Sequence, residues 1–82
     1  MDKTEFNNKI KYLIDQWCDR RELKPLRCIL NAQAGFNGLT DGWEMMLSEL
    51  KNIRFQFSNN IREEELDIVV MLIHATEEAL GK

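Results

Sequence analysis

The side chains able to do acid–base or nucleophilic chemistry are few, and none stands in a recognisable arrangement. His74 is the only histidine, and Ser48 and Ser58 lie in no nucleophile motif. His74 follows Ile73 in an apolar stretch, which predicts a structural histidine at the edge of the core or one at a pH-dependent interface. We therefore predict no catalytic residue and a protein that is not an enzyme.

The two cysteines give no metal or redox site. The spacing of Cys18 and Cys28 fits no zinc or disulfide-exchange motif. Together with His74 they would still lack a fourth ligand for structural zinc. Both lie beside apolar residues, so we expect buried, reduced thiols, which a first helical hairpin could bring into contact. The predicted metal and cofactor content is none.

Consecutive carboxylates at Glu63–Glu65 do not resemble a catalytic pair. Three successive residues of a helix point in different directions, so these carboxylates would not converge on one substrate. They are predicted to complement the helix dipole and to form a solvated surface. No phosphate-binding loop is predicted either, because Gly35, Gly38 and Gly42 lack the accompanying strand and lysine.

Apolar residues recur at steps of three and four along most of the chain, as in the stripe of Phe6, Ile10, Leu13 and Trp17. This spacing predicts an all-α fold, with each apolar stripe covered by the others in a small compact bundle. Residues 1–82 are predicted to form a single helical domain. Its four helices are expected at about 3–23, 25–34, 41–57 and 61–80.

Helix boundaries are predicted from proline, glycine and polar residues. Pro25 disfavours the α conformation at Lys24, so the first helix should end there and Pro25 should open the second. Gly35 is a natural C-terminal stop. Asn60 and Glu63 have the residue types expected of a cap pair for the last helix.

The composition favours a small acidic cytoplasmic protein. The longest apolar run is 68–73, far below the roughly 20 residues of a membrane span, so no membrane association is expected. No signal-type segment follows the first residues, which predicts a cytoplasmic location. The net charge of −3 divides into +2 through Leu30 and −5 from Asn31 onward. This asymmetry is suited to antiparallel packing or to a charged partner, although such asymmetry is more often simply a solvated surface.

Nucleic-acid binding is the alternative function, and the sequence makes it unlikely. A recognition helix beginning near Asp41 and Glu44 would repel the phosphates that it approaches. A weak nucleic-acid-binding regulatory domain would instead use a basic cluster, which is interleaved with acids. The members of this basic cluster are Arg20, Arg21, Lys24 and Arg27.

Protein–protein interaction is the favoured function. More apolar residues lie off the main stripes than a lone 82-residue bundle is expected to cover. The predicted interface comprises Phe36, Leu39, Trp43, Ile68, Met71 and Leu72. We accordingly predict a non-enzymatic helical interaction module, acting as a homodimer, an adaptor or an inhibitor or immunity-type partner protein. The segment from Phe36 to Trp43 has a second interpretation, in which it only closes one end of the bundle.

Overall fold

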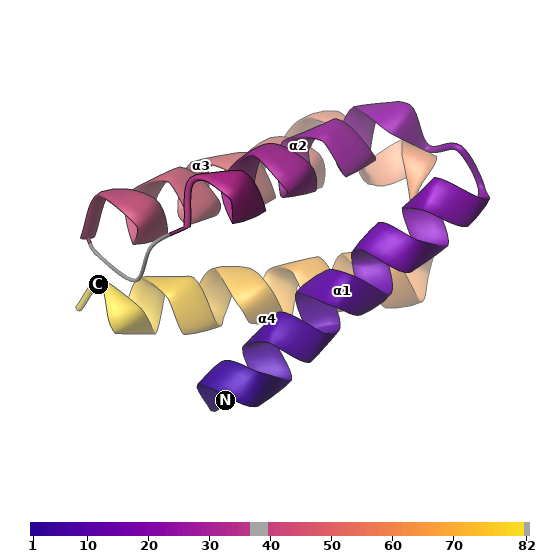
Figure 1. The fold of residues 1–82 in the computed structure, drawn as a ribbon. Coiled ribbons are helices and arrows are strands. Elements are labelled where there is room, and N and C mark those ends of the chain that lie inside the picture. Colours follow the sequence, from indigo (N-terminus) through magenta and orange to yellow (C-terminus); the bar gives the residue numbers. More distant parts are fainter. Residues whose placement is uncertain (37–39, 82) are drawn as a thin grey trace.

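A computed structural model describes residues 1–36 and 40–81, and this part of the chain forms four α-helices without any strand (Figure 1). The helices are α1 (Lys3–Asp19), α2 (Leu23–Ala34), α3 (Thr40–Gln56) and α4 (Glu63–Ala79), with a 3-10 turn, η1 (Ser58–Asn60), before α4. The predicted all-α bundle of four helices is confirmed. Nowhere in the described part is a helix both long and apolar enough to cross a lipid bilayer.

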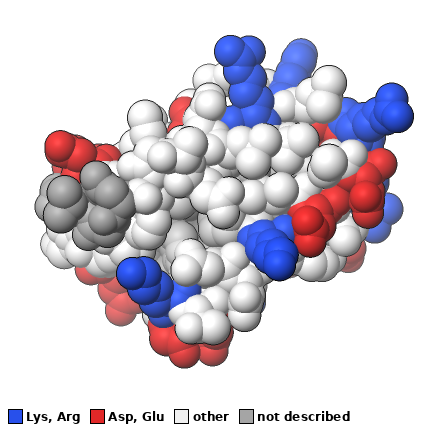
Figure 2. All heavy atoms as spheres, viewed as in Figure 1, with Lys and Arg blue, Asp and Glu red and all other residues white. Residues whose placement is uncertain are grey.

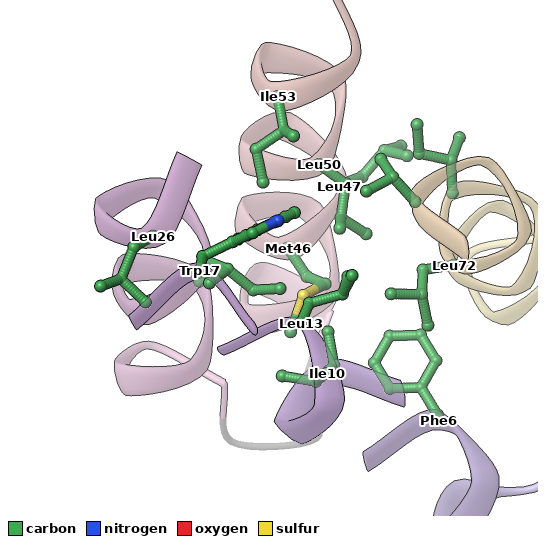
Figure 3. Close-up of a cluster of buried hydrophobic side chains, with 14 residues drawn as sticks. Phe6, Ile10, Leu13, Trp17, Leu26, Met46, Leu47, Leu50, Ile53 and Leu72 are labelled. Carbon is green, nitrogen blue, oxygen red and sulfur yellow. The ribbon is translucent and has the colours of Figure 1, made fainter. Parts of the chain in front are cut away.

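Each helix contributes an apolar stripe to one continuous core (Figure 3). Trp17 of α1 and Leu72 of α4 are both completely removed from solvent at its centre. Burying a large apolar side chain contributes roughly 1.5–3 kcal/mol to folding, so these stripes hold the helices together. The core consists of Phe6, Ile10, Leu13, Trp17, Leu26, Ile29, Ala32, Met46, Leu47, Leu50, Ile53, Val69, Leu72 and Ile73.

The helices do not all pack in the same way. In Figure 1, α2 and α3 run nearly alongside each other, whereas α1 crosses α4 obliquely. The two helices α1 and α4 contact each other closely where the end of α1 meets the start of α4, through Arg20 and Glu65. The opposite end of this helix pair carries a hollow that residues of both helices line.

The link between α1 and α2 differs from the prediction. α1 ends at Asp19, four residues before the predicted boundary, because Arg21 adopts a left-handed conformation with φ of 58°. The N–H of Glu22 donates to Trp17 O at 2.9 Å, and the N–H of Arg21 donates to Cys18 O at 3.2 Å. This pair of bonds is a Schellman motif, which caps carbonyls that the end of a helix leaves unpaired.

Pro25 was predicted to open the second helix, but it is the third residue of that helix. α2 begins at Leu23, and Lys24 is helical although it precedes proline. The first four N–H groups of a helix have no partner within the helix, so a proline in this turn removes no hydrogen bond. Gly35 does end α2, but with φ of −88° it does not use the conformational freedom of glycine.

α4 begins at Glu63 and its N-cap is Arg62, so the predicted cap pair of Asn60 and Glu63 is wrong. The carboxylate of Glu65 turns back and accepts a hydrogen bond from the N–H of Arg62 at 2.9 Å. The third residue of the helix therefore satisfies the backbone donor at its start, as in one half of a capping box.

Candidate functional site

Three aromatic rings meet where the start of α1, the end of α2 and the start of α3 come together. The ring centroids of Phe36 and Trp43 are 4.7 Å apart at an interplanar angle of 84°, and those of Phe6 and Trp43 are 5.4 Å apart at 72°. Both are edge-to-face arrangements, which aromatic pairs favour because the positive edge of one ring meets the negative face of the other. Phe6 is buried, whereas Phe36 and Trp43 remain partly exposed. The cluster therefore presents aromatic surface to solvent.

A pocket of about 520 Å³, which we call the aromatic pocket, lies beside these rings. Its size falls within the range of about 300–1,000 Å³ found for binding sites of small molecules and side chains. The α4 side is lined by the small residues Ala75 and Ala79, which leave room for an occupant. The complete lining is Met1, Asp2, Lys3, Phe6, Phe36, Trp43, Ala75, Glu78 and Ala79.

A second, shallower hollow of about 300 Å³ lies farther along the same pair of helices, and we call it the tyrosine hollow. Tyr12 of α1 and Ile68 of α4 supply its apolar surface, while Glu5, Asn8 and Lys9 supply its polar edge. Tyr12 is 42% exposed. Exposed tyrosine is typical of interfaces, because its ring offers apolar area and its hydroxyl a hydrogen bond.

No family model, curated protein or solved structure matches this chain.

The predicted interface residues do not all lie on one surface. Phe36 and Trp43 meet at the aromatic pocket, and Ile68 lines the tyrosine hollow. Met71, three residues beyond Ile68 on α4, is 44% exposed. Leu72 was wrongly predicted to lie on a free face, because it belongs with Val69 and Ile73 to the face of α4 that packs in the core, and it is completely buried. The predicted Leu39 lies outside the described residues.

The basic cluster is not intact as a phosphate-binding surface. Arg20 is engaged with Glu65: both terminal guanidinium nitrogens donate to the carboxylate, Nη1 to Oε2 at 2.7 Å and Nη2 to Oε1. Arg21, Lys24 and Arg27 are exposed. A bidentate pair of this kind fixes the guanidinium, so one of the three arginines of the cluster is already neutralised.

The position of Glu65 differs most clearly from the one predicted from the sequence. It was assigned to a solvated acidic surface, but it is completely buried. Besides Arg20 and the Arg62 N–H, the indole Nε1–H of Trp17 donates to its Oε1 at 3.0 Å. A sequence signal was present, because Glu65 precedes Val69 by four residues and Leu72 by seven and therefore shares their buried face.

The surroundings of Glu65 keep its carboxylate charged. Burial alone would raise its pKa, but the hydrogen bonds from Arg20, from the Arg62 N–H and from Trp17 outweigh burial and lower the pKa from 4.5 to about 2. Trp17 and Arg20 reach this carboxylate from α1. The group therefore joins the end of α1 to the start of α4 and is structural.

The remaining candidates for chemistry lie apart from the pockets. His74 is exposed on α4, and Cys18 is exposed on α1, so the predicted burial of Cys18 is wrong. Cys28 is partly buried; burial and the nearby carboxylate of Glu49 both raise the pKa of its thiol. Within residues 1–36 and 40–81, no three His, Cys, Asp or Glu side chains are grouped so that they could hold a metal ion.

Proposed function

We propose that this chain is a small non-enzymatic protein–protein interaction module, and that its partner inserts a side chain into the aromatic pocket. The observation that carries the proposal is the pocket itself, an opening of about 520 Å³ beside the rings of Phe6, Phe36 and Trp43. Buried aromatic-lined pockets are where a few residues of a partner contribute most of the binding free energy. Another protein, as for an adaptor or inhibitor, or a second copy of the chain would supply that side chain.

Concave shape is the reason to prefer this site over other apolar surface. Exposed apolar side chains also occur elsewhere, for example Leu23 and Leu30 on α2 and Phe55 on α3, but these three line neither the aromatic pocket nor the tyrosine hollow. Single exposed apolar residues are common on soluble proteins and do not mark a site. The face in Figure 2 is largely uncharged in its middle, with most of its charged side chains near the edge. The aromatic pocket itself has three charged residues in its lining, Asp2, Lys3 and Glu78, so a partner would meet charge beside the aromatic rings.

The nucleic-acid alternative has less support. It depended on four free basic side chains, and the ion pair with Glu65 occupies Arg20. Asp19 and Glu22 lie within the same stretch and reduce its attraction for phosphates. We therefore do not propose it as a second function.

Two matched variants test the proposal. Ala79 and Ala34 are each the exposed last residue of a helix, α4 and α2, but Ala79 lines the aromatic pocket and Ala34 does not. Ala79→Trp should fill the pocket, whereas Ala34→Trp adds the same bulk elsewhere. Circular dichroism should give the same helix content and Tm for both variants.

The readout is binding of the partner by affinity capture from extract, together with solution mass by light scattering over a concentration series. We expect a captured protein, or a self-associated form, that Ala79→Trp loses and Ala34→Trp keeps. The proposal is wrong if the wild-type protein stays monomeric and captures the same proteins as Ala79→Trp.

A further inference from the structure

The aromatic pocket and the tyrosine hollow are aligned along one face of α4. Ala75 lines the first and Ile68 the second. These residues are seven apart, which is two helical turns, so they point in nearly the same direction with a separation of about 10 Å along the axis. Met71, which is 44% exposed, lies between them in sequence and adds flexible apolar surface. The two hollows and Met71 form what we call the α1–α4 seam.

Acidic residues lie at both ends of this seam. Glu64 precedes Ile68 by one turn and Glu78 follows Ala75 by one turn, so both carboxylates are on the same side of α4 as the hollows. Both are exposed, and Glu78 lines the aromatic pocket itself. They are 14 residues apart, or about 21 Å along the helix. A partner with two groups about 21 Å apart would therefore place one beside Glu64 and the other beside Glu78.

The α1 side of the seam does not cancel this charge. Four charged residues in the first half of α1 or just before it line the two hollows. Two are acids, Asp2 and Glu5, and two are bases, Lys3 and Lys9. The α4 side contributes Glu64 and Glu78, so these six charged side chains together carry a net negative charge. Complementary charge would favour a basic partner over an acidic one.

We infer that the α1–α4 seam binds a basic amphipathic helix of a partner protein, whose two apolar anchors are seven residues apart and whose Lys or Arg residues lie one turn outside each anchor. The inference rests on the proposed function and deepens it by naming the kind of partner. Anchors at i and i+7 of a helix are spaced like Ile68 and Ala75, so one would fill each hollow. The flanking bases would then reach Glu64 and Glu78.

The test uses designed helical peptides as probes and the two indole N–H signals of the protein as reporters. The first peptide is alanine-rich with leucine anchors at i and i+7 and lysine one turn outside each. The second has glutamate in place of those lysines, and the third keeps lysine but moves the second anchor to i+5. Trp43 touches the aromatic pocket, whereas Trp17 is buried against Glu65 and serves as the internal reference.

We expect the first peptide to shift the Trp43 indole signal and leave that of Trp17 in place. It should bind about 10-fold more tightly than each of the other two at low salt, because two exposed charge pairs and a matched anchor spacing each add a modest free energy. Glu64→Lys/Glu78→Lys should reverse the preference in favour of the glutamate peptide. The control variant Asp15→Lys/Asp19→Lys makes the same change in net charge at exposed positions of α1 that line neither hollow. It should keep the wild-type preference for the lysine peptide.

The outcomes distinguish this inference from the proposed function. Equal binding of the lysine and glutamate peptides, lost in Ala79→Trp, would overturn the inference and leave the aromatic pocket as a protein-binding site. No shift of Trp43 with any of the peptides would also overturn it, and the capture experiment then decides the proposed function by itself. A doubled solution mass that depends on Ala79 and that the lysine peptide does not reduce would assign the seam to a second copy of the chain, again contrary to this inference.

Discussion

Trp17 and Glu65 are 48 residues apart in the chain, yet the indole N–H of one donates to the carboxylate of the other at 3.0 Å inside the bundle. Arg20, less than one turn after Trp17, completes the group by pairing with the same carboxylate. A buried charge is tolerated only when it is paired and hydrogen-bonded, and here both conditions are met. This contact joins the end of α1 to the start of α4, at the end of the helix pair opposite the aromatic pocket.

Stability should fall in acid because of Glu65. Its pKa is about 2 in the folded state against 4.5 ordinarily, so the contribution is fully present above pH 4.5 and is lost as the pH falls toward 2. Linkage gives it a size of about 3 kcal/mol. Urea unfolding at several pH values measures it. Glu65→Gln should be less stable at pH 7 and should lose this pH dependence, whereas the exposed neighbour Glu64→Gln should retain it. A steep acid transition that persists in Glu65→Gln would contradict this origin.

The pairing of Arg20 with Glu65 should appear as a coupling free energy. Removing one partner leaves the other without its counter-charge. The stability losses of the two single variants should therefore sum to more than the loss of the double variant. For Arg20→Met combined with Glu65→Gln we expect a coupling of about 1–3 kcal/mol in a double-mutant cycle. The cycle with Arg21→Met, an adjacent exposed arginine, should give a value near zero. Equal couplings in the two cycles would mean that the interaction is not specific to Arg20.

Arg21→Gly should stabilise the protein. Arg21 holds φ of 58° in the Schellman motif, a conformation that costs an ordinary residue about 1–2 kcal/mol and glycine almost nothing. The greater freedom of glycine in the unfolded chain offsets part of this, which leaves a net gain of about 0.5–1 kcal/mol. Thermal and urea unfolding measure the gain. Arg21→Ala, which keeps the strained backbone, should not reproduce it, and a gain as large in Arg21→Ala would rule out the conformational explanation.

The periodic stripes carried enough information to predict the helices and most of the core. Steps of three and four from Phe6 to Trp17 identify the buried face of α1, and the structure buries that face. Helix ends were predicted less well. Pro25 suggested a boundary, but the turn is made by Arg21, a residue whose type gives no sign of a left-handed conformation.

The candidate site was only partly predictable, because it depends on contacts between distant segments. The apolar character of Phe36 and Trp43 suggested a surface role, and both line the aromatic pocket. Their meeting with Phe6 is a tertiary contact that periodicity does not encode. Burial of Glu65 was missed because an acid in the first turn of a helix is also what the helix dipole favours. Stabilisation by the helix dipole and burial in an ion pair both place an acid at this position, and the prediction considered only the helix dipole.

Leu72 and Met71 should respond very differently to truncation although they are neighbours on α4. Leu72 is completely buried, so Leu72→Ala removes core contacts and leaves a cavity, at a cost of about 2–5 kcal/mol. Met71→Ala should change stability by about 0.5 kcal/mol or less, because the side chain is 44% exposed. Chemical unfolding measures both. Comparable losses would mean that Leu72 and Met71 are buried to the same extent, contrary to the orientation of α4 in the bundle.

The two thiols should differ in their rate of alkylation in the native protein. Cys18 is exposed, so iodoacetamide reaches it without any opening of the bundle. Cys28 is partly buried. Burial, and to a smaller extent the nearby carboxylate of Glu49, raises the pKa of its thiol. A raised pKa lowers the fraction of reactive thiolate at pH 8. Mass spectrometry of digests taken over time should therefore find Cys18 modified first. In concentrated urea the rates should become similar, since both causes are lost on unfolding. Native Cys28 reacting as fast as Cys18 would show that the packing of α2 against α3 does not shield it.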